Sequence, residues 1–412
     1  MLKKISVSAL RTGMYIDKFD GNWLKHPFWK TSFKLQTNKD LNAIKNSGLT
    51  HLWIDTSRGD DINSDADEAS PKSADPVENI PEESVAVETE QDTQPPTHQT
   101  VPITEEIQVA QKILNEAKQA TMDMFKDARM GNTISTAEVG PLVDEISESV
   151  TRNPAAMICI TRMKNKDDYT YLHSVAVCAL MIALGKQLNY RGDIHALGMA
   201  GLLHDVGKMA IPEDILNKPG KLTDEEFERV KSHPRRGWEM LMENDVRDEV
   251  SLDVCLHHHE RVDGQGYPEK LSAKNLSLEA RMGAVCDVYD AITSDRSYKK
   301  GWEPAESLKK MALWQDGHFD SDVFKAFVKT IGIYPSATLL KLKSGRLGVV
   351  IDQSSKTLLE PKIKIFFSCS GNAPIPTKII DLSHSNESIE SIESPETWGF
   401  NRQQLMDILN QH

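Results

Sequence analysis

The stretch Gly201-Leu-Leu-His-Asp-Val-Gly-Lys208 places an imidazole and a carboxylate side by side at the end of an apolar run. Such a pair is weak evidence alone, because adjacent polar residues are common at helix ends. Imidazoles and carboxylates in larger numbers suit divalent iron, manganese or zinc, and one carboxylate can bridge two ions. The chain holds more such candidates on either side of the pair: His173, His233, the cluster His257-His258-His259-Glu260, and Asp287.

The composition is that of a protein with two or three domains in a reducing compartment. The chain has 412 residues, of which 39% are hydrophobic. No apolar run approaches the roughly 20 residues that cross a bilayer, and no signal-peptide core follows the start, so we expect a cytoplasmic protein without membrane insertion. The five cysteines are scattered and lack CxxC spacing, which indicates reduced thiols.

The net charge of −13 is mostly local. Residues 60–92 hold about a dozen acidic side chains against one lysine, so the remainder of the chain is nearly neutral. The composition therefore gives no reason to expect binding to a nucleic-acid polymer.

The N-terminal part of the chain consists of two segments that differ in composition and apolar pattern. Residues 1–56 are expected to form a small α+β accessory domain, with strands over 3–8 and 49–55 and a short helix over 40–48 closed by a glycine cap. Residues 57–102 contain too few large apolar groups to offset their ordering entropy, so we predict a disordered acidic linker.

Helical patterns begin after this linker. Residues 103–163 are expected to form a helical connector, with helices over 104–130, 141–152 and 154–161. These helices could pack on the next domain or form the seam of a dimer, and the pattern does not separate the two arrangements.

Residues 164–334 are densely helical by pattern and contain every clustered histidine. The segment 171–188 is apolar nearly all round, as a buried central helix should be, and 194–206 is an apolar run that reaches the His-Asp pair. Thr223-Asp-Glu-Glu226 is a capping box that opens a further helix. Additional helices are expected over 278–294, 303–313 and 320–331.

After Pro335 the apolar period changes to two. This change predicts a β-rich C-terminal extension over 335–412, which ends in a short helix over 402–410. Strands are expected over 338–343, 347–351, 362–367 and 378–382. The expected fold class is therefore multidomain and mainly α, with an all-α domain between a small α+β domain and a β-rich extension.

Residues 165–332 resemble the HD-GYP family, a branch of the HD metal-dependent phosphohydrolases. The N-terminal unit and its acidic linker also resemble the domain that often precedes HD-GYP domains in gamma-proteobacteria. The motifs that carry the main resemblance are, in chain order, His173-Ser174, Gly201-Leu-Leu-His-Asp-Val-Gly-Lys208, Lys218-Pro-Gly-Lys-Leu-Thr223, Ser232-His-Pro234, His258-His-Glu-Arg-Val-Asp-Gly-Gln-Gly-Tyr-Pro268 and Asp287-Val-Tyr-Asp-Ala-Ile-Thr-Ser-Asp-Arg-Ser-Tyr298.

The resemblance implies an enzyme that hydrolyses a cyclic dinucleotide, typically cyclic di-GMP, to linear pGpG or to GMP. It also implies two divalent metal ions, iron or manganese, with Asp205 as the bridge and a hydroxide between the ions as the nucleophile. Carried over residue by residue, one ion is held by His173, His204, Asp205 and Asp287, and the other by Asp205, His233, His258 and His259.

The resemblance also implies the groups that meet the substrate. Asp205 and Lys208 are the expected catalytic residues, and Lys208 is expected to hold the scissile phosphate. Arg296 and Lys299 match positions that contact substrate phosphates. The turn Gly266-Tyr267-Pro268 is expected to shape the substrate pocket or a surface for a partner, without taking part in the chemistry.

The chain departs from the family pattern at one position. Some members hold a third metal through a glutamate four residues before the first histidine, and that position is Tyr169 here. We therefore predict two metal ions and not three. We expect His257 to support a ligand or to be a packing residue, and Asp290 to orient a ligand or to pair with a helix end, without either binding metal.

Three functions stay open at the level of sequence. The first is an active cyclic di-GMP phosphodiesterase, and the second is a phosphodiesterase that prefers another cyclic dinucleotide, such as cyclic GMP-AMP. The third is a non-catalytic module that binds the dinucleotide or a partner. All the ligands expected for two metals are present, which favours catalysis. The expected partners are a cyclic dinucleotide and either a diguanylate cyclase or a second copy of the chain.

Overall fold

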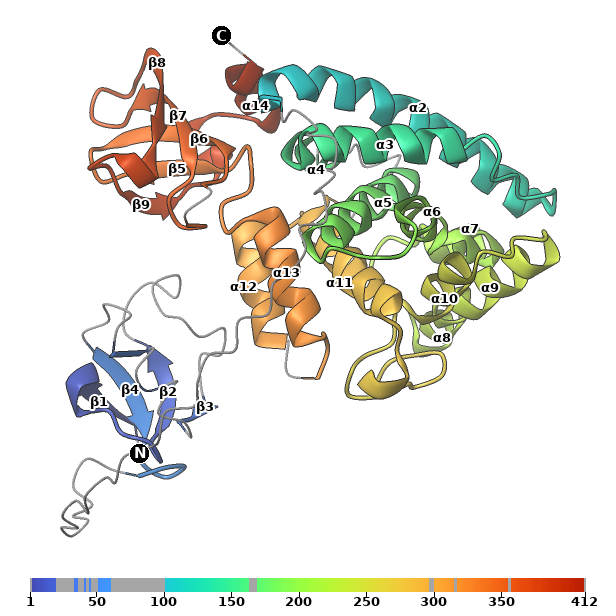
Figure 1. Ribbon diagram of the computed structural model, residues 1–412, viewed down its shortest axis with the longest axis horizontal. Coiled ribbons are helices and arrows are strands. Elements are labelled where there is room, and N and C mark those ends of the chain that lie inside the picture. The colour runs from blue at the N-terminus through green and yellow to red at the C-terminus, as the bar shows by residue number, and fades with distance from the viewer. Residues whose placement is uncertain are drawn as a thin grey trace, which may run out of the picture. The chain divides into compact units, whose positions relative to one another are not determined.

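The computed structural model describes residues 2–19, 33–35, 41, 44–45, 51–60, 101–162, 169–295, 300–314, 317–354 and 357–410. The chain divides into two compact units, residues 1–98 and 99–412, and each is described by itself (Figure 1). Most of the linker predicted over 57–102 lies outside the described residues. The division into five parts stays a prediction.

The first unit is built on a four-stranded antiparallel sheet in the order β1-β4-β2-β3. The predicted strands are β1 (Leu2–Ser6) and β4 (His51–Asp55), which pair with each other. The strands β2 (Tyr15–Phe19) and β3 (Phe33–Lys34) were not predicted. Most of the helix expected over 40–48 lies outside the described residues, although residues 41, 44 and 45 are helical.

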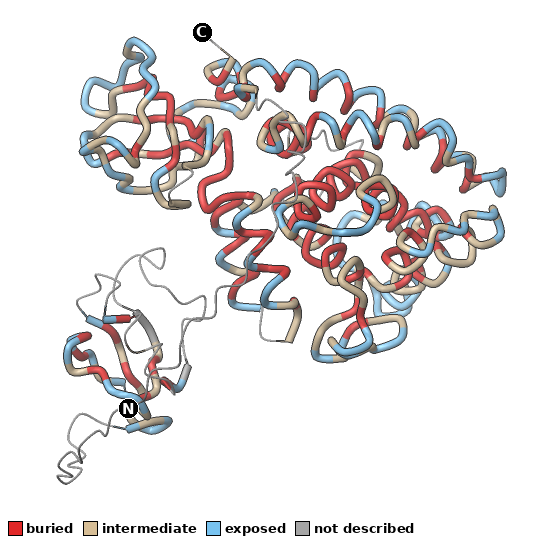
Figure 2. Tube along the Cα trace, in the orientation of Figure 1, coloured by how far each residue is buried: buried red, intermediate tan, exposed pale blue. Residues whose placement is uncertain are grey.

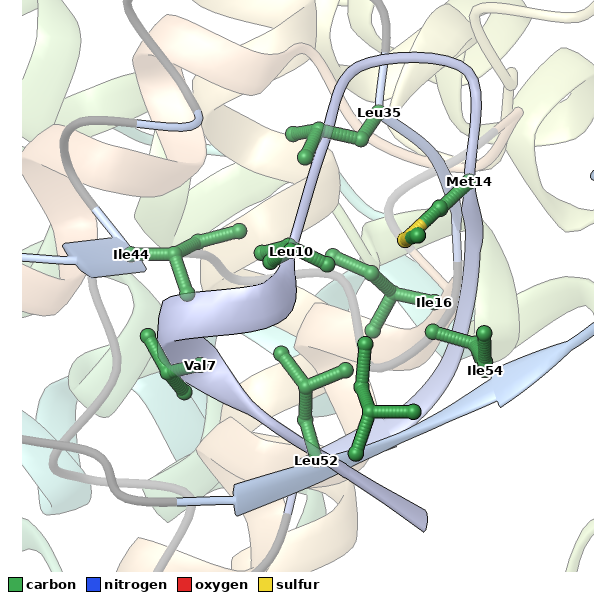
Figure 3. Packing of buried hydrophobic residues seen from close by; sticks show 9 residues of the cluster. Val7, Leu10, Met14, Ile16, Leu35, Ile44, Leu52 and Ile54 are labelled. Atoms are coloured by element: carbon green, nitrogen blue, oxygen red, sulfur yellow. The ribbon is translucent and has the colours of Figure 1, made fainter. Parts of the chain in front are cut away.

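The core of this unit forms because alternate strand residues point to one face of the sheet. These residues pack with apolar side chains from the connecting segments (Figure 3). The cluster comprises Ile5, Val7, Leu10, Met14, Ile16, Leu35, Ile44, Leu52 and Ile54.

The second unit begins with an all-α part, in agreement with the sequence. Its helices are α2 (Ile103–Met130), α3 (Gly140–Arg152), α4 (Pro154–Thr161), α5 (Tyr169–Gln187), α6 (Ile194–Leu203), α7 (Glu213–Leu216), α8 (Asp224–Lys231), α9 (His233–Glu243), α10 (Glu249–His257), α11 (Leu278–Thr293), α12 (Pro304–Trp314) and α13 (Ser321–Ile331).

Helix α5 is the central element of this part and is buried along most of its length (Figure 2). It packs against α6, α11, α2 and α13, among others. Within the described part of the chain it is the one helix long and apolar enough to cross a membrane, but 78% of its apolar window is buried inside the protein. This burial is typical of a helix in the core of a folded domain.

The apolar run over 194–206 is not one continuous helix. Helix α6 ends at Leu203, His204 and Asp205 form a turn, and a 3-10 helix follows over Val206–Ala210. Close packing accompanies this break, because a Cβ atom at Gly207 would lie 2.0 Å from the carbonyl oxygen of His233 at the start of α9. The missing side chain lets the two segments approach, which brings His233 toward the His-Asp turn.

The C-terminal extension is a five-stranded antiparallel sheet in the order β8-β7-β6-β5-β9, followed by α14 (Arg402–Asn410). The four predicted strands and the terminal helix are confirmed, and β9 was not predicted. The strands are β5 (Leu339–Leu342), β6 (Arg346–Asp352), β7 (Lys362–Ser368), β8 (Ala373–Asp381) and β9 (Ile389–Ile392).

The contact between α5 and α6 gives a test of this packing. A Cβ atom at Gly201 on α6 would lie 2.8 Å from the backbone of Cys178 on α5. We expect Gly201→Ala to lower the free energy of unfolding by about 1–3 kcal/mol, because the helices must separate. Gly371→Ala is the control, since its nearest neighbour would be the Ser368 hydroxyl at 3.7 Å. Equal stability of the two variants in urea unfolding would contradict the close α5–α6 contact.

Candidate metal centre

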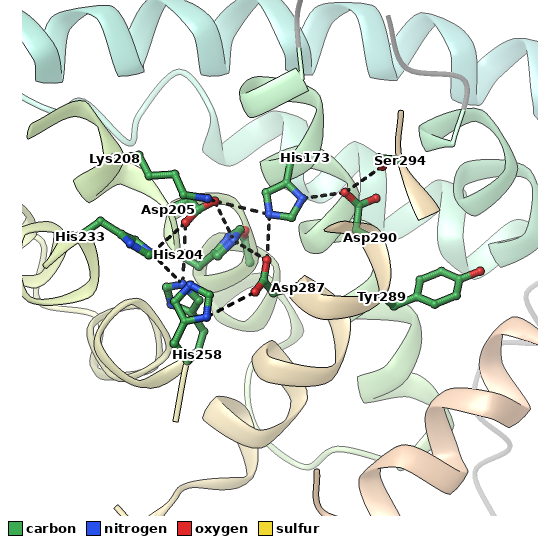
Figure 4. A network of polar contacts seen from close by, with 12 residues as sticks. His173, His204, Asp205, Lys208, His233, His258, Asp287, Tyr289, Asp290 and Ser294 are labelled. Atoms are coloured by element: carbon green, nitrogen blue, oxygen red, sulfur yellow. Dashed lines mark hydrogen bonds and ion pairs between the residues drawn. The ribbon is translucent and has the colours of Figure 1, made fainter. Parts of the chain in front are cut away.

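Four imidazoles and two carboxylates from separate segments meet inside the helical part (Figure 4). His173 comes from the second turn of α5, His204 and Asp205 from the turn after α6, and Asp287 from the middle of α11. His233 opens α9, and His258 follows α10 directly. All six residues are buried, with Asp287 the most exposed at 5%.

The two oxygens of the Asp205 carboxylate face different pairs of imidazoles. Its Oδ2 atom lies 3.4 Å from Nε2 of both His173 and His204. Its Oδ1 atom lies 3.2 Å from Nε2 of His233 and 3.7 Å from Nε2 of His258. A carboxylate placed in this way can bind two cations at once.

Asp287 completes the first of these groups. Its Oδ1 atom lies 3.0 Å from Nε2 of His173 and 3.8 Å from Nε2 of His204, and its Oδ2 atom lies 3.7 Å from Nδ1 of His259. The ligand atoms of His173, His204 and Asp287 all lie within 4.8 Å of one another, as do those of His233, His258 and His259. A third such group, His204, Asp205 and His258, joins the two.

The buried imidazoles are oriented as metal ligands usually are. Nδ1 of His204 contacts the carbonyl oxygen of Gly201 at 2.8 Å, and Nδ1 of His233 contacts that of Val230 at 2.7 Å. Nδ1 of His258 lies 3.1 Å from two backbone carbonyl oxygens, at Val254 and Cys255. A carbonyl can only accept, so each Nδ1 carries a proton, and Nε2 is the ring nitrogen that faces the cluster.

His173 is oriented by a carboxylate instead. Its Nδ1 atom lies 2.6 Å from Oδ2 of Asp290, three residues after Asp287 on α11. Asp290 therefore faces the outer side of His173, away from the Nε2 atom that points into the cluster (Figure 4). Such carboxylate–histidine pairs hold the ring in the tautomer that binds metal.

The donor set fits a divalent cation. Nε2 of His204 and Oδ1 of Asp205 are fully buried and make no hydrogen bond within the described part of the chain. Leaving a buried polar atom without a hydrogen bond is costly, and a cation would supply both atoms with a partner. The residues therefore form a site able to hold divalent metal.

The protonation states of the carboxyl and imidazole groups also suit metal binding. Burial disfavours ionisation of Asp205, but Lys208 and the neighbouring imidazoles outweigh it and hold the pKa of this carboxyl well below its usual range. Burial lowers the pKa of His259 to about 3, and burial together with the adjacent imidazoles places the pKa of His258 far below its usual value. Neutral imidazoles thus stand beside ionised carboxylates at neutral pH, as metal binding requires.

His204 behaves differently from these two histidines. Burial opposes its charge, yet Asp205 and Asp287 together raise its pKa to about 10. A cation that binds at Nε2 displaces this proton, so metal binding here is coupled to proton release.

Comparison with known proteins agrees with this geometry. A family model described as HD domain matches residues 154–323, and a domain of unknown function (DUF3391) matches residues 2–139. The chain is 49% identical over 406 residues to a cyclic di-GMP phosphodiesterase of Pseudomonas aeruginosa, which covers 97% of this chain and 94% of that protein. The chain belongs to the HD-GYP branch of the HD domain family.

Two other relatives match shorter parts of this HD-GYP protein. A cyclic di-GMP phosphodiesterase response regulator of Xanthomonas campestris is 41% identical over 138 residues, which is 33% of this chain and 36% of that protein. A 3'3'-cGAMP-specific phosphodiesterase of Vibrio cholerae is 33% identical over 176 residues, which is 42% of this chain and 41% of that protein.

Lys208 lies at the edge of the cluster in the HD-GYP domain. Its Nζ atom contacts Oδ2 of Asp205, and its side chain is 20% exposed. The lysine is held three residues after the aspartate by the 3-10 helix, so its ammonium group borders both the carboxylate and solvent.

The Gly-Tyr-Pro turn lies against the histidine pair. The Tyr267 ring stacks on the His259 ring with their centroids 4.7 Å apart, and the Tyr267–Pro268 peptide bond is cis. A Cβ atom at Gly266 would lie 2.4 Å from Cα of Glu260, so only glycine allows this approach. The turn therefore forms one wall beside His259.

Glu260 has a role that we did not infer from the sequence. Its buried carboxylate accepts hydrogen bonds from the backbone N–H groups of Glu269 at 2.6 Å, Lys270 at 2.9 Å and Leu271 at 3.1 Å. These three residues follow Pro268, so Glu260 anchors the Gly-Tyr-Pro turn to the histidine pair. An acid directly after two ligands and before a glycine-rich turn is the signal that could have indicated this role.

The remaining predicted residues fall into two groups. His257 points away from the cluster, with Nδ1 2.7 Å from Asp253 and Nε2 3.4 Å from Glu269, and Tyr169 stacks on His173 with centroids 5.5 Å apart. Arg296 and Lys299 lie outside the described residues.

Replacing the central carboxylate tests the site. We expect Asp205→Ala to lose most of its divalent metal, because both imidazole pairs lose their shared anion. Asp290→Asn should keep all the ligands but lower metal affinity by about 10–100-fold through loss of ring orientation. Metal analysis of chelator-titrated protein measures both effects, with His257→Gln as the control. Full metal content in Asp205→Ala would contradict the assignment.

Replacing the anchoring carboxylate tests the turn. Glu260→Gln should lose at least one of the three backbone hydrogen bonds and destabilise the turn by about 1.5–3 kcal/mol. The expected readout is faster hydrogen exchange at the amides of residues 269–271. Glu239→Gln, which removes only an exposed pair with Arg236, should leave exchange there unchanged. Equal protection in the two variants would show that Glu260 does not hold the turn.

Proposed function

We propose that this chain is a cyclic di-GMP phosphodiesterase that opens the ring to give linear pGpG or, after a second cleavage, GMP. The observation that carries the proposal is the Asp205 carboxylate, whose two oxygens face two separate pairs of imidazoles. The nearly full-length likeness to the Pseudomonas enzyme supports the choice of substrate.

We infer two divalent ions, iron or manganese, with Asp205 as the shared ligand. Bound there, such ions would lower the pKa of a water molecule toward neutrality and would withdraw charge from the phosphate oxygens. One ion would be held by His173, His204, Asp205 and Asp287, and the other by Asp205, His233, His258 and His259.

The protein groups around the cluster would position the phosphodiester. The Lys208 ammonium group stands beside Asp205 and is open to solvent, so it can hold a phosphate oxygen and stabilise the charge that develops there. The wall of His259 and Tyr267, with Gly266 and Pro268, would shape the pocket next to it. Arg296 and Lys299 stay predicted phosphate contacts.

The cellular compartment of the enzyme is proposed from its cysteines. All five cysteines are free, and four of them are buried, which fits the reducing cytoplasm. A diguanylate cyclase or a second copy of the chain remains the proposed macromolecular partner.

Product formation from cyclic di-GMP and from cyclic GMP-AMP tests the function. The metal-loaded protein should hydrolyse cyclic di-GMP with the higher kcat/KM. Lys208→Gln should lower kcat by about 10²–10³ while retaining its metal, because it removes one cation that acts on the transition state. Lys325→Gln on α13, whose exposed side chain pairs with Asp322, is the matched lysine control.

Two outcomes would contradict this proposal and assign a different function. Faster turnover of cyclic GMP-AMP would assign the other dinucleotide as substrate. No turnover of either compound by protein that carries both metals would indicate a receptor.

A further inference from the structure

Residues 294–303 connect α11 to α12 and are named here the α11–α12 connection. Its last residues fold back on α11, because the backbone N–H group of Trp302 donates to the carbonyl oxygen of Ile292 at 2.8 Å. The connection is therefore fixed to the last turn of α11.

The connection begins beside the metal centre. The Ser294 hydroxyl lies 3.4 Å from Oδ2 of Asp290, the carboxylate oxygen that contacts Nδ1 of His173 at 2.6 Å (Figure 4). Arg296 and Lys299, the predicted phosphate contacts, belong to the same connection and lie outside the described residues. The position of the connection therefore bears on how a substrate meets the metal centre.

The C-terminal extension packs on the helical part through α14. Residues 335–412 lie outside both family models that match this chain, so the comparisons give the extension no role. Leu405, Met406 and Leu409 form the buried face of α14, and Sδ of Met406 lies 3.4 Å from Sγ of Cys159 on α4. Burial of this apolar face holds α14 in place without any charged contact.

Two ion pairs join the extension to the α11–α12 connection. Nη1 of Arg402, the first residue of α14, lies 3.4 Å from Oδ2 of Asp295. Nζ of Lys300 lies 2.7 Å from Oε1 of Glu396, which stands between β9 and α14. The extension thus contacts the connection both before and after the predicted phosphate contacts.

The two pairs differ in exposure. Arg402 and Asp295 are 27% and 28% exposed, whereas Lys300 and Glu396 are 58% and 52% exposed. Hydrogen bonds from Lys300 and Ser394 lower the pKa of Glu396 to about 2, so this carboxylate is ionised at neutral pH. Such pairs contribute little to the stability of a whole chain, but they restrict the segment that they hold. A segment ordered before its ligand arrives loses less entropy when the ligand binds.

We propose that the C-terminal extension positions the α11–α12 connection for substrate binding, with Arg402 and Glu396 as the positioning residues. This inference rests on the proposed activity toward a cyclic dinucleotide. The two residues act through Asp295 and Lys300 and not on the reacting phosphate. Without them, part of the binding free energy of the substrate is used to order the connection, so KM rises, while the groups that set kcat stay in place.

Steady-state kinetics with cyclic di-GMP on the metal-loaded, full-length chain tests the proposal. Arg402→Gln and Glu396→Gln should each raise KM about two- to fivefold and leave kcat and metal content unchanged. One substitution removes a positive charge and the other a negative charge. A general effect of charge on an anionic substrate would therefore shift KM in opposite directions. Arg402→Lys keeps the cation and should restore the native KM.

Lys341→Gln is the control, because its pair with Glu390 at 3.0 Å joins β5 to β9 inside the extension. It should leave KM unchanged. The proposal is overturned if Arg402→Gln and Glu396→Gln keep the native KM, if they shift it in opposite directions, or if the control raises it equally. A thermal melt checks the fold, and Glu396→Gln carries the test alone if Arg402→Gln unfolds.

The native chain separates this inference from the proposed activity. If the native chain hydrolyses cyclic di-GMP and both variants match it, the inference fails and the activity stands. If the native chain does not hydrolyse cyclic di-GMP, the proposed activity fails, and calorimetric binding of the same compound takes the place of KM. Equal affinity of the native chain and both variants, or no binding to any of them, then overturns the inference as well.

Discussion

The burial of the Asp205 carboxylate is the constraint on which the helical part depends. A carboxylate without exposure costs several kcal/mol unless opposite charges and hydrogen bonds surround it. Four imidazoles and Lys208 do so, and they come from α5, α9 and the segments after α6 and α10. The arrangement of these helices is therefore the one that brings their ends to a single carboxylate.

At the ends of three helices, one hydrogen bond both satisfies a backbone carbonyl group and orients a histidine ring. The last carbonyl groups of a helix have no partner inside it. At the ends of α6, α8 and α10, such carbonyl groups accept the Nδ1 protons of His204, His233 and His258. The same hydrogen bond satisfies the helix end and aims Nε2 at the centre. This explains why these three histidines lie just after helices.

Local signals account for what could be predicted from the sequence. Helices with long apolar patterns, such as α2, α5 and α11, begin and end within two residues of their predicted limits. Strands β3 and β9 are short and lie at the edges of their sheets, where each pairs with one neighbour, so no local pattern marks them. The role of Glu260 rests on three backbone amides, which carry no residue signature.

The candidate site, too, could be predicted from the sequence only in part. The ligand types and their order follow from motifs, whereas the split of the Asp205 oxygens between two imidazole pairs is a property of packing.

Helix α5 carries His173 in its second turn, and α6 leads directly into His204 and Asp205, so the packing of these two helices sets the spacing of three ligands. The approach of Gly201 to the Cys178 backbone opposes any sliding of α5 against α6, because the helices are already at contact distance. The contact that packs the two helices therefore also holds these ligands at fixed positions relative to one another.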